Sequence, residues 1–266
     1  MTHHYTKKIV LALTLATCAS LHNIAMAEHF AKLDQAISPG SENAVTNYAP
    51  VFDFDTDGCL PTTAISRTGQ QNPGLKTSGS ITGQCRENAF MPTANTYHRW
   101  VRRTVNGVNY DAHMYELYFE KDQATVLGGG HRHDVESVVM FFKNGQPTYV
   151  APSAHGAYDV QPFASVPKRN GSHPAIVYHK DGISTHAFRF AKPGENPENA
   201  YGQWVTPTIL SWNVAQVAGS LSNAQYRANL NSFDFGSASF KTKDSNFLSQ
   251  INSLRDHLPA DYPVFQ

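Results

Sequence analysis

The residues best suited to chemistry lie between Asp122 and Glu136. This stretch carries carboxylate and imidazole side chains close together, interrupted after Asp122 by a run of three glycines, Gly128, Gly129 and Gly130. The remaining members of the set follow the glycines: His131, His133, Asp134 and Glu136. Hard divalent cations prefer carboxylate oxygens, and imidazole nitrogens also serve as metal ligands. Glycines let the backbone turn tightly and approach a ligand closely. The pattern predicts a divalent-cation site.

A strand that begins at Asp134 would arrange part of this site. Along such a strand Asp134 and Glu136 project from one face, and Val135 and Ser137 from the other. Asp122 returns from the preceding strand. Three neighbouring carboxylates repel one another, and a divalent cation relieves that repulsion. The alternative is a charged hairpin loop whose histidines form ordinary hydrogen bonds.

An enzyme is a second alternative. His131 and His133 with a nearby glutamate resemble the metal triad of cupins, which would imply an oxygenase or isomerase. In cupins, however, the glutamate lies further from the second histidine than Glu136 lies from His133, and Asp134 has no role there. A metal-assisted hydrolase would also use a carboxylate and a histidine beside a metal. The chain has no G-x-S-x-G nucleophile motif.

The elements around this stretch are predicted mainly as strands. Apolar and β-branched residues fill a series of short segments separated by turn residues: 114–119, 137–142, 147–151, 175–179 and 186–190. Asn144-Gly145 is typical of a tight hairpin turn, and 180–182 forms a second turn. Strands at this spacing favour a single-domain, mostly β sandwich with a few flanking helices rather than βαβ units.

Helices are predicted near both ends. Apolar residues at helical spacing favour a short amphipathic helix over 28–37 and another over 244–257 that packs on the sandwich. In between, Asp53, Asp55 and Asp57 alternate with other residues before Gly58, which predicts a strand with one acidic, solvated face. The alternative is a calcium loop, because the spacing resembles the start of an EF-hand loop, although no acidic residue closes such a loop.

The N-terminal residues predict a signal peptide. Lys7 and Lys8 precede an apolar run from Ile9 to about Leu21, and Ala25-Met26-Ala27 supplies the small residues of a cleavage site. We expect a secreted protein cleaved after Ala27, with one mature domain over 28–266. No later stretch is long and apolar enough to span a bilayer.

Charge and cysteines narrow the class further. The whole chain has 21 lysines and arginines and 21 aspartates and glutamates. The leader contains two lysines and no acidic residue, so its removal takes away two positive charges. The mature chain is therefore slightly acidic, which argues against a nucleic-acid partner. Cys59 and Cys85 remain after processing. An even count in an exported protein favours one disulfide over reactive thiols, here across a segment rich in Gly, Pro, Ser and Thr.

The stretch Gly130-His131-Arg132-His133-Asp134-Val135-Glu136 resembles the signature of the necrosis- and ethylene-inducing (Nep-like) family at six of seven positions. Other segments are similar to the family in the same order: 54–59, 72–76, 114–123, 153–156 and 173–186. The resemblance runs from about residue 50 to residue 250.

The resemblance implies a β-sandwich like that of actinoporins and fungal lectins, and no catalysis. It implies that Mg²⁺ or Ca²⁺ is held by Asp122, His131, Asp134 and Glu136. It further implies a ligand cavity with Asp181, His133, His155 and His186. The expected partner is the glycosylated head group of plant inositol-phosphoceramide sphingolipids, bound at the membrane surface by a monomer that then permeabilises the membrane.

Two positions depart from the family. Val135 replaces the aromatic residue usual between Asp and Glu, and Glu116 lies in a strand that is usually apolar and aromatic. A non-lytic, lectin-like sugar-binding member therefore stays open as an alternative. Trp100, Trp204 and Trp212 are candidates for interfacial anchoring, with burial in the core as the alternative.

Overall fold

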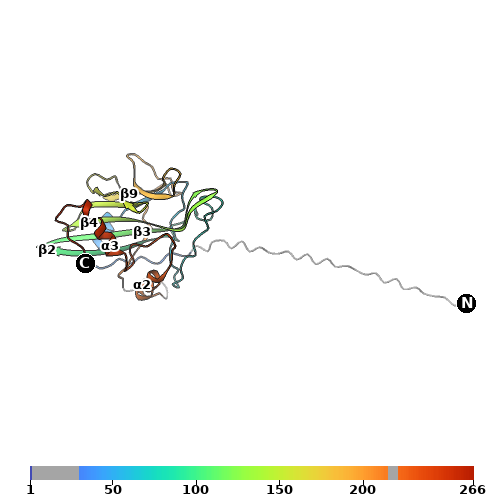
Figure 1. Cartoon of the computed structure of the whole chain (residues 1–266), viewed down its shortest axis with the longest axis horizontal. Coiled ribbons are helices and arrows are strands. Elements are labelled where there is room, and N and C mark those ends of the chain that lie inside the picture. The colour runs from blue at the N-terminus through green and yellow to red at the C-terminus, as the bar shows by residue number, and fades with distance from the viewer. Residues whose placement is uncertain (2–29, 215–220) are drawn as a thin grey trace.

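Two β-sheets packed face to face form the centre of the molecule (Figure 1). The computed structural model describes Met1 and residues 30–214 and 221–266. The predicted signal peptide falls almost wholly outside these residues. The seven-stranded sheet has the order β11-β2-β3-β4-β5-β6, with β7 paired to β5. The four-stranded sheet has the order β1-β9-β10, with β8 paired to β9.

The strands of the large sheet are β2 (Asn95–Val105), β3 (Val108–Thr125), β4 (Gly128–Lys143), β5 (Gln146–Ala154), β6 (Ala157–Tyr158), β7 (Gln161–Pro162) and β11 (Thr208–Ser211). Those of the small sheet are β1 (Val51–Phe54), β8 (Lys168–Arg169), β9 (His173–Lys180) and β10 (His186–Phe190). The helices are α1 (Glu42–Tyr48), α2 (Asn223–Ser232), α3 (Phe247–Ser253) and the short 3₁₀ helix η1 (Arg255–His257).

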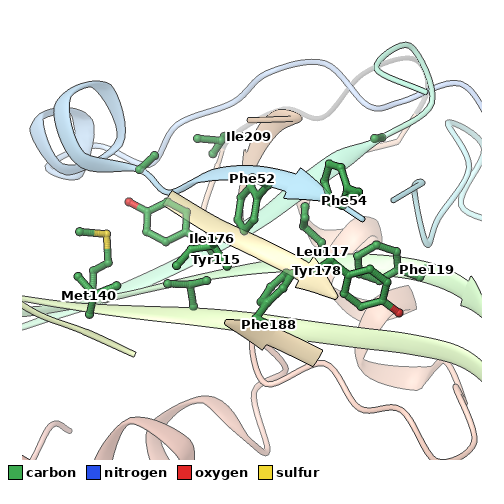
Figure 2. Packing of buried hydrophobic residues seen from close by; sticks show 14 of the residues in the cluster. Phe52, Phe54, Tyr115, Leu117, Phe119, Met140, Ile176, Tyr178, Phe188 and Ile209 are labelled. Atoms are coloured by element: carbon green, nitrogen blue, oxygen red, sulfur yellow. The ribbon is translucent and has the colours of Figure 1, made fainter. Parts of the chain in front are cut away.

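Alternating residues of the long strands pack against the small sheet. Tyr115, Leu117 and Phe119 of β3 meet Phe54 and Tyr178 in one buried cluster. The rings of Phe119 and Tyr178 are stacked with centroids 3.9 Å apart and lie side by side in Figure 2. Burial of these side chains stabilises the sandwich by about 1.5–3 kcal/mol each.

The opposite face of the large sheet is also covered. Met114 and Val139 pack against Phe247 and Ile251 of α3, whereas Tyr118 packs in a cluster with residues of α2. Figure 1 shows β9 on one side of the long strands and α2 on the other. Both faces of β3 are therefore buried, and this strand fixes the positions of its neighbours β2 and β4.

The predicted β-sandwich with flanking helices is confirmed, as are the two hairpin turns. Asn144 and Gly145 both have positive φ angles, 49° and 76°, as a two-residue hairpin turn of the predicted kind requires. The predicted disulfide is also present between Cys59 and Cys85.

Three local predictions are wrong. Residues 30–37 form no helix: Ala36 bridges Leu210 in parallel, and the Leu33 amide donates to Asn95. The C-terminal helix is shorter than 244–257, because α3 begins only at Phe247 and η1 follows it. Asp53 is not on a solvated face but fully buried, where it accepts hydrogen bonds from the backbone amides of 198 and 199.

The tryptophans favour the core interpretation. Trp204 and Trp212 are buried at 8% and 1% exposure, and Trp100 is half-buried with its ring stacked on His113. Among the residues that the structure describes, no helix has the length and apolar character needed to cross a membrane.

Candidate functional site

The site is built on the hairpin of β3 and β4. These strands pair antiparallel, so that Asp122 lies opposite His131 and Lys121 opposite Arg132. Gly130 permits this pairing, because it has a φ of +86° and a Cβ atom there would lie 2.0 Å from the carbonyl oxygen of Asp122. A glycine is therefore required where the two backbones approach.

His133 interrupts the alternation of β4. Its φ angle is +62°, in the left-handed region that non-glycine residues rarely adopt. In a regular strand His131 and Asp134 would face opposite sides, because they are three residues apart. Across the interruption both line the same cavity. The local backbone therefore creates the cluster that the sequence spacing alone does not provide.

The cluster consists of Asp122, His131 and Asp134. Each offers one ligand atom, and these atoms all lie within 4.8 Å of one another. Both carboxyls are buried, at 2% and 5% exposure, and His131 is half-buried. With Glu136 they line a cavity of about 250 Å³.

Asp122 is fixed by β10. Its carboxylate accepts hydrogen bonds from the backbone amide of His186 at 2.8 Å and from the Nδ1 atom of the same ring at 2.7 Å. His131 is fixed from within β4, because its Nδ1 atom lies 2.6 Å from the carbonyl oxygen of His133. Asp122 is thus held in place by another strand and His131 by its own.

The remaining carboxyls are held within the cavity wall. Asp134 accepts from the Tyr178 hydroxyl at 2.9 Å and from the Val135 amide at 2.9 Å. Glu136 accepts a hydrogen bond from the Ser153 hydroxyl. Burial raises the pKa of Asp134 and of Glu136, and neighbouring carboxylates raise both further. A bound cation would lower the electrostatic cost of keeping them ionised.

Of the four residues predicted for the ligand cavity, the structure places two in its lining and two outside it. His155 and His186 line the cavity. Asp181 is exposed and does not line it, although its carboxylate lies 3.2 Å from the Nε2 atom of His155 at the rim. His133 lies outside the cavity: its Nδ1 atom is 2.7 Å from the Tyr118 hydroxyl. Burial lowers the pKa of His133 to about 4.

Sequence reasoning missed several residues of the cavity. Hydroxyl, amide and amine groups from distant segments complete its wall: Ser137, Ser153, Tyr158, Thr185, Ser237, Ser239, Lys241 and Gln250. Ser153 lies two residues before His155, in the segment 153–156 that resembles the family, and this was the available signal for it. Nothing in the sequence around Lys241 indicates a role in a site that is more than a hundred residues away.

The two departures from the family pattern have different surroundings. Val135 is half-buried, lines the cavity and packs against the cluster that contains Tyr118. Glu116 is fully buried and accepts hydrogen bonds from the backbone amides of Lys241 and Thr242. Glu116 thereby anchors the C-terminal segment that forms one wall of the cavity.

The donor set fits a hard cation and a polyhydroxyl ligand. The carboxylate oxygens of Asp122 and Asp134 suit a hard cation such as Mg²⁺ or Ca²⁺, and the His131 imidazole would add one nitrogen donor to them. The hydroxyls, the ammonium group and the amide can donate to or accept from sugar hydroxyls. The cavity is therefore suited to binding a cation together with a small polar ligand.

Known proteins share this architecture. A family model described as Necrosis inducing protein (NPP1) matches residues 42–254. NLP effector protein 3 of Phytophthora capsici is 31% identical over 217 residues, covering 79% of this chain and 81% of the relative.

Solved structures agree with these sequence matches. NLPPya in complex with mannosamine has a TM-score of 0.64 and 27% identity, covering 83% of this chain and 94% of that chain. Non-toxic HaNLP3 has a TM-score of 0.65 and 25% identity, covering 84% and 95%.

Proposed function

Because the chain belongs to the family of necrosis-inducing proteins, we propose that its mature form is a secreted cytolysin that binds sugar head groups of plant sphingolipids through the acidic cavity. The family comprises necrosis-inducing effectors rather than enzymes. The observation that supports the proposal most directly is the convergence of Asp122, His131 and Asp134 in one cavity lined with sugar-compatible groups.

The proposed cation ligands are Asp122, His131, Asp134 and Glu136. Glu136 lies outside the cluster of ligand atoms but lines the same cavity, so it suits a contact through water. Mg²⁺ and Ca²⁺ both accept such mixed sets of carboxylates and water. When bound, the cation supplies a positive centre that attracts sugar hydroxyl oxygens.

The proposed ligand is the glycosylated head group of inositol-phosphoceramide sphingolipids. NLPPya is a relative whose complexes with mannosamine and with glucosamine have been solved. In this chain, His155 and Asp181 stand at the rim and Lys241 in the wall, where they can contact sugar hydroxyls.

Exposed apolar residues support contact with a membrane surface. Val126 and Leu127 form the tip of the β3–β4 hairpin and are 63% and 97% exposed, and Ile183 in the β9–β10 turn is 92% exposed. Side chains at the tips of two hairpins can enter the headgroup region, where burial of each would stabilise the bound state.

Export is proposed from the leader and the disulfide together. Cleavage after Ala27 would release 28–266, and a disulfide between Cys59 and Cys85 suits an oxidising compartment. The non-lytic alternative is favoured by the likeness to non-toxic HaNLP3, since the same fold is found in a protein described as lacking toxicity.

Calorimetric titration of Mg²⁺ and Ca²⁺ into the processed protein tests the cation site. We expect Asp134→Asn to weaken cation binding at least tenfold, because it removes a buried ligand charge. Asp256→Asn, a change of an exposed residue in η1, is the matched control. Unchanged affinity in Asp134→Asn would refute the assignment.

Vesicles and leaves then separate lysis from binding. Dye release from vesicles containing the sphingolipid, with necrosis of infiltrated dicot leaves, would establish a cytolysin. Binding without dye release or necrosis would establish the non-lytic alternative. Absence of cation-dependent binding to those vesicles would refute both.

A further inference from the structure

A second pocket lies on the other face of the β3–β4 hairpin. It has a volume of about 470 Å³ and lies between the hairpin and the segment 74–84. We call it the basic pocket, because its charged lining residues are Lys76, Lys121 and Arg132. Among the described residues, no acidic side chain lines it. The acidic cavity, by contrast, is lined by Asp122 and its register partner His131.

The segment that closes the basic pocket is fastened to the hairpin. The Leu75 backbone amide donates to the Glu120 carbonyl at 2.8 Å, and the side-chain Nε2 of Gln123 donates to the Gly79 carbonyl at 2.8 Å. The disulfide between Cys59 and Cys85 closes the chain just beyond this segment. The pocket therefore has two fixed walls rather than one mobile loop.

The three basic side chains retain unused hydrogen-bond donors. Lys121 donates to Ser80 at 2.8 Å and to Gln123 at 3.0 Å, which uses two of its three protons. Arg132 donates one hydrogen bond, to the Pro73 carbonyl at 3.0 Å. Within 30–214 and 221–266, no ion pair joins any of the three to a carboxylate.

The charge of Lys121 makes this arrangement costly without a counterion. The residue is only 2% exposed, and a buried ammonium group without a carboxylate partner is unfavourable. Ser80 and Gln123 supply neutral oxygens alone. An anion in the pocket would offset this cost and use the free donors of Arg132, whose guanidinium group suits phosphate geometry.

We propose that the basic pocket is an anion site that binds a phosphate group through Lys76, Lys121 and Arg132. The phosphate is either free in solution or the phosphodiester of a lipid head group. Binding there is independent of the cation in the acidic cavity. Only the lipid source rests on the proposed function.

The first test measures binding of inorganic phosphate with a chelator present and ionic strength held constant with chloride. Calorimetric titration compares the wild type with Lys76→Gln/Arg132→Gln, whose side chains are both exposed. The control is Lys192→Gln/Arg103→Gln. It removes the same charge, and Arg103 likewise donates one hydrogen bond to a backbone carbonyl, that of Val264.

The second test measures co-sedimentation with phosphatidylcholine vesicles that contain phosphatidylinositol, with the same variants. We expect the first double variant to bind at least about tenfold more weakly in one or both tests, because it loses charged hydrogen bonds to the phosphate, and we expect the control to match the wild type. Weaker binding of inorganic phosphate by the first double variant identifies a free-phosphate site. Weaker binding of vesicles alone identifies a lipid phosphodiester.

Two results would overturn the proposal. One is absence of phosphate binding together with equal vesicle binding by all three proteins. The other is an equal loss in the control, which would show a general charge effect. Asp134→Asn separates this proposal from the proposed function, because that variant should lose the cation and keep the anion.

Discussion

The acidic cavity and the basic pocket use adjacent residues of the same two strands in opposite ways. Asp122 and His131 form one register pair, and Lys121 and Arg132 form the next. Because neighbouring residues of a strand point to opposite faces, the pairs are sorted by charge onto the two sides of the hairpin. One short sequence thus builds two sites of opposite sign.

The two sites differ in how their charged groups are satisfied. In the acidic cavity, hydrogen bonds from His186, Tyr178 and Ser153 reach the carboxyls, yet burial and neighbouring carboxylates still raise the pKa of Asp134 and of Glu136. In the basic pocket the positively charged side chains lie on two walls and keep unused hydrogen-bond donors. Both sites are therefore electrostatically unfavourable without a counterion, and they differ in that the basic pocket keeps unused hydrogen-bond donors.

The largest expected effect comes from Gly130→Ala, which disturbs both sites at once. A Cβ atom there meets the Asp122 carbonyl at 2.0 Å and φ is +86°, so we expect the free energy of unfolding to fall by about 3 kcal/mol or more. Gly129→Ala is the control: φ is +83°, but the nearest atom lies at 3.5 Å, so the loss should be about 1 kcal/mol. Urea denaturation measures both. Equal losses would show that the close approach of the strands is unimportant.

Asp122→Asn should have the next largest effect on stability, and of the two sites it should alter only the acidic cavity. The carboxylate holds both the backbone amide and the ring of His186, and charged hydrogen bonds contribute about 1.5–3 kcal/mol. We expect unfolding to become about 2 kcal/mol easier and cation binding to be lost, with phosphate binding retained. Loss of phosphate binding in a folded variant would show that the two sites are coupled.

Glu116→Gln tests the wall that Lys241 adds to the acidic cavity. Burial raises the pKa of Glu116 to about 7, so the folded protein binds this proton more tightly than the unfolded chain. Its contribution to stability is therefore present below about pH 4.5 and is lost as the pH rises through 7, by at most about 1.4 kcal/mol per pH unit.

The glutamine variant should be about 1 kcal/mol less stable at pH 5, because an amide cannot accept from both backbone donors equally well. Its stability should also decline less between pH 5 and pH 8. Urea denaturation across that range, with a chelator present, measures both effects. An unchanged pH dependence would contradict the assignment to Glu116.

The smallest expected effect comes from Lys121→Met in the basic pocket. The variant loses two hydrogen bonds but also removes a buried charge without a carboxylate partner, so these effects offset each other. We expect the free energy of unfolding to change by no more than about 1 kcal/mol, by the same denaturation assay. A loss above about 3 kcal/mol would make Lys121 a structural residue like Asp122 and remove the contrast between the two sites.

The sequence by itself determined the strands, the disulfide and the existence of the acidic cluster. Alternating apolar residues such as Tyr115, Leu117 and Phe119 can bury one face only as a strand, and Asn144-Gly145 supports a two-residue turn. These signals are local, since each depends on residues within one segment. The resemblance to the necrosis-inducing family rests on the same kind of short, ordered segments.

The tertiary structure decided which charged residues face the same cavity. His133 adopts a left-handed backbone that turns His131 and Asp134 to one side and places its own ring against Tyr118. Asp53 is buried because the backbone amides of 198 and 199 reach it. Residues 30–37 are not helical because Asn95, Ile209 and Ser211 satisfy their backbone polar groups. In each case the partner comes from a distant segment, so the free energy that selects the conformation is absent from the local sequence.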